Sequence, residues 1–77
     1  MALVRNFSRG NIQRNSIHDE IDATYHTFER DGRIVLQLDT FGRKSREMPG
    51  KKSQTLQFDQ LGAATLFKIL KDEFGFK

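Results

Sequence analysis

The stretch GRIVLQLDTFGRKSREMPGKK, residues 32–52, decides the fold and contains the clearest functional signal in the chain. Its first part, from Arg33 to Phe41, is rich in Ile, Val, Leu and Phe, which is typical of a β-strand. Its second part, from Gly42 to Lys52, holds five basic residues and one acidic residue. Pro49-Gly50 in this part is a turn signal. The stretch therefore predicts a strand that leads into a cationic loop.

A second strand is predicted immediately before it, from Ile17 to Glu29, because Tyr, Thr, Ile and Phe recur there. Asp31-Gly32 favours the type I′ turn, the tightest hairpin connection. A two-residue turn at this point fixes the register of the hairpin. The expected cross-strand pairs are Arg30–Arg33, Phe28–Val35, His26–Gln37, Thr24–Asp39 and Asp22–Phe41.

Side chains alternate across a sheet, so this register assigns each residue of the hairpin to one of two faces. The apolar face is expected to carry Ile21, Ala23, Tyr25, Thr27, Ile34, Leu36 and Leu38. The polar face is expected to carry Asp22, Thr24, His26, Phe28, Val35, Gln37, Asp39 and Phe41. A slip by one residue would exchange the two sets, so the register is a sharp prediction.

A third strand and a helix are predicted after the cationic loop. In residues 53–58, Leu56 and Phe58 would join the apolar face, and Thr55 and Gln57 the polar face. Asp59 is a good N-cap for a helix from Gln60 to about Phe74, which Gly75 would end. The helix carries one apolar stripe, formed by Ala63, Leu66, Phe67, Leu70 and Phe74.

The segment of residues 1–16 leaves two alternatives: a mobile basic arm or an additional edge strand. Residues 17–77 are expected to form a single β-β-β-α domain. The predicted fold class is α+β, with a three- to four-stranded antiparallel sheet and one C-terminal helix packed on one face. A chain of 77 residues has a thin core, and it has no cysteine with which to reinforce that core.

The composition is typical of a protein without a membrane segment, because no apolar run approaches the ~20 residues that span a bilayer. The first residues lack the apolar core of a signal peptide, so a cytoplasmic location is expected. The formal net charge is only +3, but it is unevenly distributed: residues 42–52 are strongly basic, and the acidic cluster is Asp19, Glu20 and Asp22.

The sequence predicts neither an enzyme nor a cofactor. It contains no Walker or GxGxxG loop, and neither histidine has an evident serine partner. The metal-capable residues are His18, Asp19, Glu20, Asp22 and His26. In a strand, Asp22 and His26 would lie roughly 13 Å apart, too far to share one ion, so no metal site is expected.

The features that remain favour nucleic-acid binding. Arg43, Lys44, Arg46, Lys51 and Lys52 can neutralise phosphates. Phe28 and Phe41 can stack on bases, with Arg30 and Arg33 at the hairpin tip. Asp22 and Asp39 on the same face argue against stacking, because they repel phosphate. The alternative is that the loop is only a solvated surface and that the N-terminal segment or a partner subunit covers the rings.

Three segments together resemble the positive-cofactor-four family of transcriptional coactivators: residues 32–38, residues 47–52, and residues 55–59 followed by the amphipathic helix. The resemblance covers about half the chain, from Phe28 to Leu70. It implies a homodimer with curved antiparallel sheets that binds single-stranded DNA. It assigns phosphate contacts to the turn from Pro49 to Lys52. The sequence departs from the family in having Asp39 where a basic residue is expected, and in having no tryptophan.

The leading hypothesis is a non-catalytic nucleic-acid-binding protein that prefers single-stranded DNA and forms a homodimer. An alternative of the same class is a sheet that enters a duplex groove, as in the arm-binding domains of phage integrases. A different alternative is a protein-interaction module, such as a small accessory or inhibitor protein of a phage or defence system, which would bind an acidic protein surface.

Overall fold

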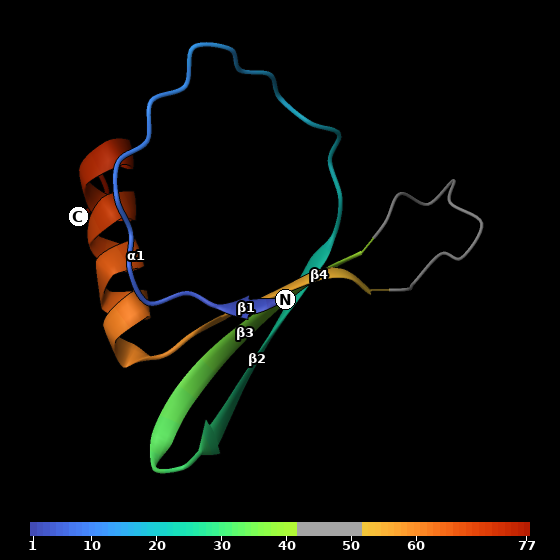
Figure 1. The fold of residues 1–77 in the computed structure, drawn as a ribbon, viewed down its shortest axis with the longest axis vertical. Helices are drawn as coiled ribbons and strands as arrows, with labels where there is room; N and C mark the ends of the chain where they lie inside the picture. Colours follow the sequence, from blue (N-terminus) through green and yellow to red (C-terminus); the bar gives the residue numbers. More distant parts are fainter. Residues whose placement is uncertain (42–51) are drawn as a thin grey trace.

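The protein is described by a computed structural model, and the structure describes residues 1–41 and 52–77. The elements in chain order are β1 (Ala2–Leu3), β2 (Ala23–Arg30), β3 (Arg33–Phe41), β4 (Lys52–Phe58) and α1 (Gln60–Phe74). They form a four-stranded sheet of order β1-β4-β3-β2 with one helix on it, so the α+β class is confirmed (Figure 1). β1 runs parallel to β4, which makes the sheet mixed and corrects the antiparallel prediction at that edge.

The β2–β3 hairpin has the predicted turn and the predicted register. Asp31 and Gly32 both have positive φ, 54° and 76°, as a type I′ turn requires. Arg30 lies opposite Arg33, and the ladder continues through Phe28–Val35, His26–Gln37 and Thr24–Asp39. The strand itself is shorter than predicted, because it begins at Ala23 instead of Ile17. The residues that this register would place opposite 17–21 are 42–46, which lie outside the described residues.

The helix begins and ends where its capping residues predict. The Asp59 side chain accepts a hydrogen bond from the backbone N–H of Gly62 at 3.1 Å, so one of the unpaired donors of the first turn is satisfied. Gly75 follows the last helical residue with φ 70°, the left-handed conformation that glycine adopts without strain. The described residues contain no helix long and apolar enough to cross a bilayer.

The N-terminal segment begins with an edge strand and continues without regular structure. Ala2 and Leu3 form the edge strand, and the N–H of Val4 donates to the Gln57 carbonyl at 2.8 Å. The chain then leaves the sheet and follows α1. From there it crosses in a long arc, without regular structure, to the start of β2 (Figure 1). We call residues 5–22 the arm.

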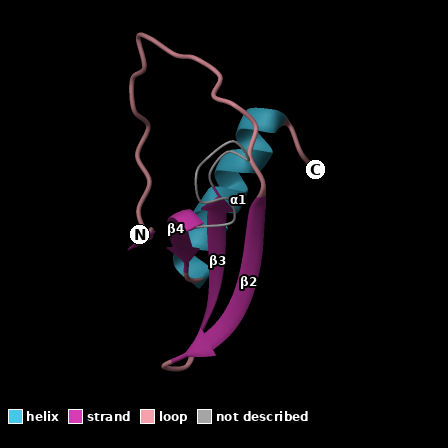
Figure 2. Cartoon of the chain, turned by 90° about the vertical axis from the view of Figure 1, so that its right-hand side faces the viewer, coloured by secondary structure: helices cyan, strands magenta, loops and turns pink. Residues whose placement is uncertain are grey.

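The arm and α1 lie on the apolar face of the sheet. Phe58 pairs with Leu36, and the ring of Phe7 stacks on the ring of Phe58 with 6.4 Å between centroids. Figure 2 shows the sheet with α1 behind it and the arm passing over the top. The packing on this face is sparse: of the two buried hydrophobic residues in the described part of the chain, Phe58 lies on this face and Val35 on the polar face.

Candidate functional site

The polar face of the sheet carries the buried residues Val35, Asp39 and Thr55. Two of the sequence-predicted site residues also lie on this face, and their side chains are exposed. Phe28 in β2 is 38% exposed, and Arg30 is exposed beside the hairpin turn. Phe41 ends β3 on the same face and is half-buried. Strand alternation therefore places both aromatic rings on the same face as Val35 and Asp39.

Asp39 is at the centre of this face, and its side chain is fully buried. The Thr55 hydroxyl donates to Oδ1 of Asp39 at 2.6 Å, and Nε2 of Gln37 donates to the two carboxylate oxygens at 3.1 and 3.2 Å. Nε2 of Gln57 in turn donates to Oε1 of Gln37 at 2.9 Å. A buried carboxylate is costly unless it accepts hydrogen bonds, and here neighbouring strands supply the donors.

The sequence placed Asp39 on the polar face but missed its burial. Strand alternation assigns a residue to a face, and it contains no information on how deeply the residue is covered. The signal in the sequence was the position of Gln37 two residues earlier on the same face; the pairing of Asp39 with Thr55 is seen only in the structure. The sequence analysis counted two carboxylates on this face, Asp22 and Asp39, against phosphate binding. Asp39 is held by donors inside the sheet, so Asp22 is the exposed one of the two.

His26 lies beside this network but is not part of a catalytic relay. Its Nε2 atom is 3.4 Å from Oδ2 of Asp39 and also 3.4 Å from the Thr24 hydroxyl. A nucleophile–histidine–carboxylate triad uses the two ring nitrogens for the two partners, one on each side of the ring. Here both contacts are made by one nitrogen, so the arrangement does not activate Thr24 as a nucleophile.

Arg33 differs from Arg30, although the two residues face each other across the hairpin. Asp59, which is buried at the N-terminus of α1, lies 3.5 Å from Arg33 and 3.0 Å from Nε of Arg5. Arg33 therefore helps to join β3, the helix start and the arm. The sequence did not indicate this role, because Arg33 and Asp59 are far apart along the chain.

The predicted cationic loop cannot be placed against this face. Arg43, Lys44, Arg46 and Lys51 lie outside the described residues, and Lys52 is paired with Phe41 in the β3–β4 ladder. Within residues 1–41 and 52–77, no group of three or more His, Cys, Asp or Glu side chains is placed to hold a metal ion.

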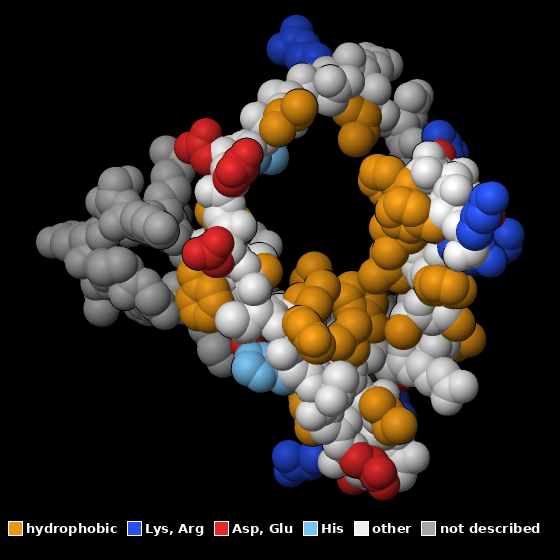
Figure 3. All heavy atoms as spheres, turned by 180° about the vertical axis from the view of Figure 1, so that it is seen from behind, with side chains coloured by type: hydrophobic (Ala, Val, Ile, Leu, Met, Phe, Trp, Pro, Cys, Tyr) orange, Lys and Arg blue, Asp and Glu red, His pale blue; other side chains and the backbone are white. Residues whose placement is uncertain are grey.

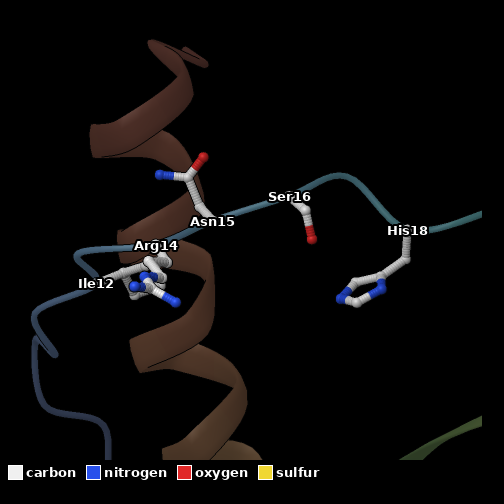
Figure 4. A pocket seen from close by; sticks show the side chains of 5 residues that line it. All are labelled: Ile12, Arg14, Asn15, Ser16 and His18. Atoms are coloured by element: carbon white, nitrogen blue, oxygen red, sulfur yellow. The ribbon is translucent and has the colours of Figure 1, made fainter.

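The opposite side of the sheet has a hollow between arm, sheet and helix, and hydrophobic side chains gather around it (Figure 3). A pocket of about 490 Å³ lies at the arm, lined by Ile12, Arg14, Asn15, Ser16 and His18 (Figure 4). All five side chains come from one irregular segment. Because no second element supplies converging groups, this pocket is not a preformed small-molecule site.

Comparison with protein-family models, curated proteins and solved structures finds no match for this chain.

Proposed function

We propose that this protein binds nucleic acid without catalysis and prefers single-stranded DNA. The observation that carries the proposal is the exposure of the Phe28 ring on the polar face, with Phe41 on the same face and Arg30 at the hairpin tip. Single strands are held when bases stack on such rings while cations follow the phosphates. Each stacked base contributes about 1–3 kcal/mol.

The phosphate contacts are assigned to the cationic residues that lead from the same sheet. Arg43, Lys44, Arg46, Lys51 and Lys52 would neutralise phosphates, with Arg30 and Arg33 at the other end of the hairpin. The burial of Asp39 supports this assignment, because its carboxylate is engaged by Thr55 and Gln37. The resemblance to the positive-cofactor-four family points to the same ligand and stays a prediction.

A homodimer in the cytoplasm is the second part of the proposal. It is supported by the small number of buried hydrophobic residues and by the exposed apolar side chains of α1. In a two-fold dimer the polar faces of two chains would offer a longer track for one strand than a single chain can.

The test is a pair of fluorescence-anisotropy titrations with a labelled single strand and the matching duplex, repeated at several salt concentrations. We expect the single strand to bind more tightly, with affinity that falls steeply as salt rises. Lys51→Ala combined with Lys52→Ala should weaken binding to all sequences alike and reduce the log–log salt slope by about 1.4. Absence of binding to either nucleic acid at low salt would refute the proposal.

Phe28→Ala isolates the stacking contribution. We expect it to weaken single-strand binding by about 1–3 kcal/mol with an unchanged salt slope, because a ring is lost and no charge is. Phe76→Ala is the matched control, since Phe76 is also exposed but lies beyond the end of α1, where its ring stacks on Phe74. Equal losses from the two variants would exclude Phe28 as a stacking platform.

The same titrations separate the alternatives. Preference for the duplex would favour the groove-binding sheet. A stable protein partner that survives nuclease treatment, with no nucleic-acid binding, would favour the interaction module.

A further inference from the structure

The chain exposes far more surface than a compact monomer of its size. Its accessible surface is 7286 Å², whereas a folded monomer of 8.9 kDa exposes about 4,800 Å². Its radius of gyration is 14.8 Å, against about 11 Å for a compact chain of this length. The excess is about 2,500 Å² per chain, more than the ~800 Å² that each partner buries in a standard protein–protein interface.

Large apolar side chains of the arm and of α1 are among the exposed ones. In the arm, Ile12 is 73% exposed and Ile17 is fully exposed. On α1, the stripe residues Phe67 and Phe74 are 61% and 69% exposed. Together with the sheet, these two elements bound the hollow of Figure 3. Apolar surface of this extent is characteristic of an interaction site.

The arm is attached to the rest of the molecule at both ends. At the first end, Arg5 pairs with Asp59 at 3.0 Å and Arg9 pairs with Glu73 at 2.6 Å, so this part follows α1. At the other end the chain enters β2 at Ala23. The residues between, 10–22, span from the helix to the sheet edge (Figure 1), and the isoleucines among them, Ile12, Ile17 and Ile21, are exposed.

We infer that residues 10–22 form a clasp that closes over helix α1 of a second copy of this chain. The occupant of the hollow must be elongated and apolar on one side. The helix α1 has both properties, and Phe67, Leu70 and Phe74 of its stripe are exposed. In a two-fold symmetric dimer, each helix enters the hollow of the other chain, so both apolar stripes are buried at once. The inference rests on the proposed homodimer, but it does not depend on nucleic acid.

The first experiment measures the dimer dissociation constant of the full chain without nucleic acid, by light scattering and sedimentation. Ile12→Glu combined with Ile17→Glu should raise this constant at least tenfold, since two charges would enter an apolar interface. Leu61→Glu is the matched control: Leu61 is also exposed but lies on the opposite side of α1 from Leu70. It should leave the constant unchanged. A monomeric wild-type chain at micromolar concentration, or an arm variant that dimerises like the control, would overturn the inference.

The second experiment distinguishes a partner's helix from the chain's own helix, and it does not require a destabilised variant. The sequence has no cysteine, so Ile17→Cys and Phe74→Cys introduce single reactive sites. A short bis-maleimide added to a mixture of the two single variants should produce covalent heterodimers. A chain that carries both cysteines is tested in parallel. If cross-links form only within this double variant and no heterodimer appears in the mixture, the arm closes on its own helix and the clasp is refuted. Failure of nucleic-acid binding would leave both results unaffected.

Discussion

At the scale of single residues, Asp39 is the polar group on which the sheet depends most. A carboxylate removed from water costs several kcal/mol unless donors replace the solvent. Thr55 and Gln37 supply those donors, and Gln57 continues the chain of hydrogen bonds across β4. No buried side-chain nitrogen or oxygen in the described residues lacks a hydrogen-bond partner.

Replacing Asp39 with Ala should therefore lower the free energy of unfolding by about 3 kcal/mol. The Thr55 hydroxyl and the Gln37 amide would lose their acceptor, and each unsatisfied group costs about 1–3 kcal/mol. Urea unfolding followed by circular dichroism measures the loss. Asp72→Ala is the control, because Asp72 is exposed and forms only a surface pair with Lys68 at 3.0 Å, worth about 0.3–0.5 kcal/mol. Similar losses in the two variants would contradict the role given to the buried carboxylate.

At the scale of elements, the close approach of β1 to α1 requires glycine at position 62. A Cβ atom at Gly62 would overlap the carbonyl oxygen of Val4, which immediately follows β1. The same glycine donates its N–H to Asp59, so the helix start, the edge strand and the arm meet at one point. This contact decides where the arm leaves the sheet.

Gly62→Ala should destabilise the fold by about 1–3 kcal/mol, because overpacking against backbone cannot be relieved by a rotamer change. In an unobstructed helix the same substitution stabilises by about 1 kcal/mol, so the sign of the change is diagnostic. The measurement is the urea midpoint, together with proteolysis in the arm, which should become faster. Gly10→Ala is the control, since nothing lies within 4 Å of a Cβ there. A more stable Gly62→Ala variant would show that β1 does not dock as described.

At the scale of the whole molecule, the hydrophobic core of one chain is small. Val35 and Phe58 are the hydrophobic residues buried in the described part of the chain. Small domains with such cores commonly gain stability by association. If the proposed homodimer forms, folding and dimerisation are coupled, and stability becomes a function of protein concentration.

We therefore expect the thermal and urea midpoints to rise as the protein concentration is increased over a hundredfold range. The physical reason is mass action, because only the folded chains form the dimer. The arm variant with Ile12→Glu and Ile17→Glu should lose most of this dependence, whereas Leu61→Glu should keep it. Midpoints that do not change with concentration would show that one chain folds alone.

The correct and incorrect sequence predictions have different physical origins. The hairpin register followed from Asp31-Gly32, because a two-residue turn fixes every later pair. The bounds of α1 followed from Asp59 and Gly75, which act on the nearest turn of backbone. The start of β2 was predicted too early, since β-propensity at Ile17 and Ile21 indicates suitability for a strand but supplies no partner strand. The face of Phe28 was predicted correctly, and its use as a stacking platform stays a prediction.

The sequence alone determined the features that depend on local chemistry: the turn, the helix caps, the alternation of the two sheet faces and the apolar stripe of α1. Only the tertiary structure decided what depends on residues distant along the chain. These features are the parallel pairing of β1 with β4, the burial of Asp39 under its donors, and the two arginines on Asp59. The path of the arm, in an arc from α1 to the start of β2, is another such feature (Figure 1). Local preferences fix the backbone within a few residues, whereas burial and pairing depend on which distant surfaces meet.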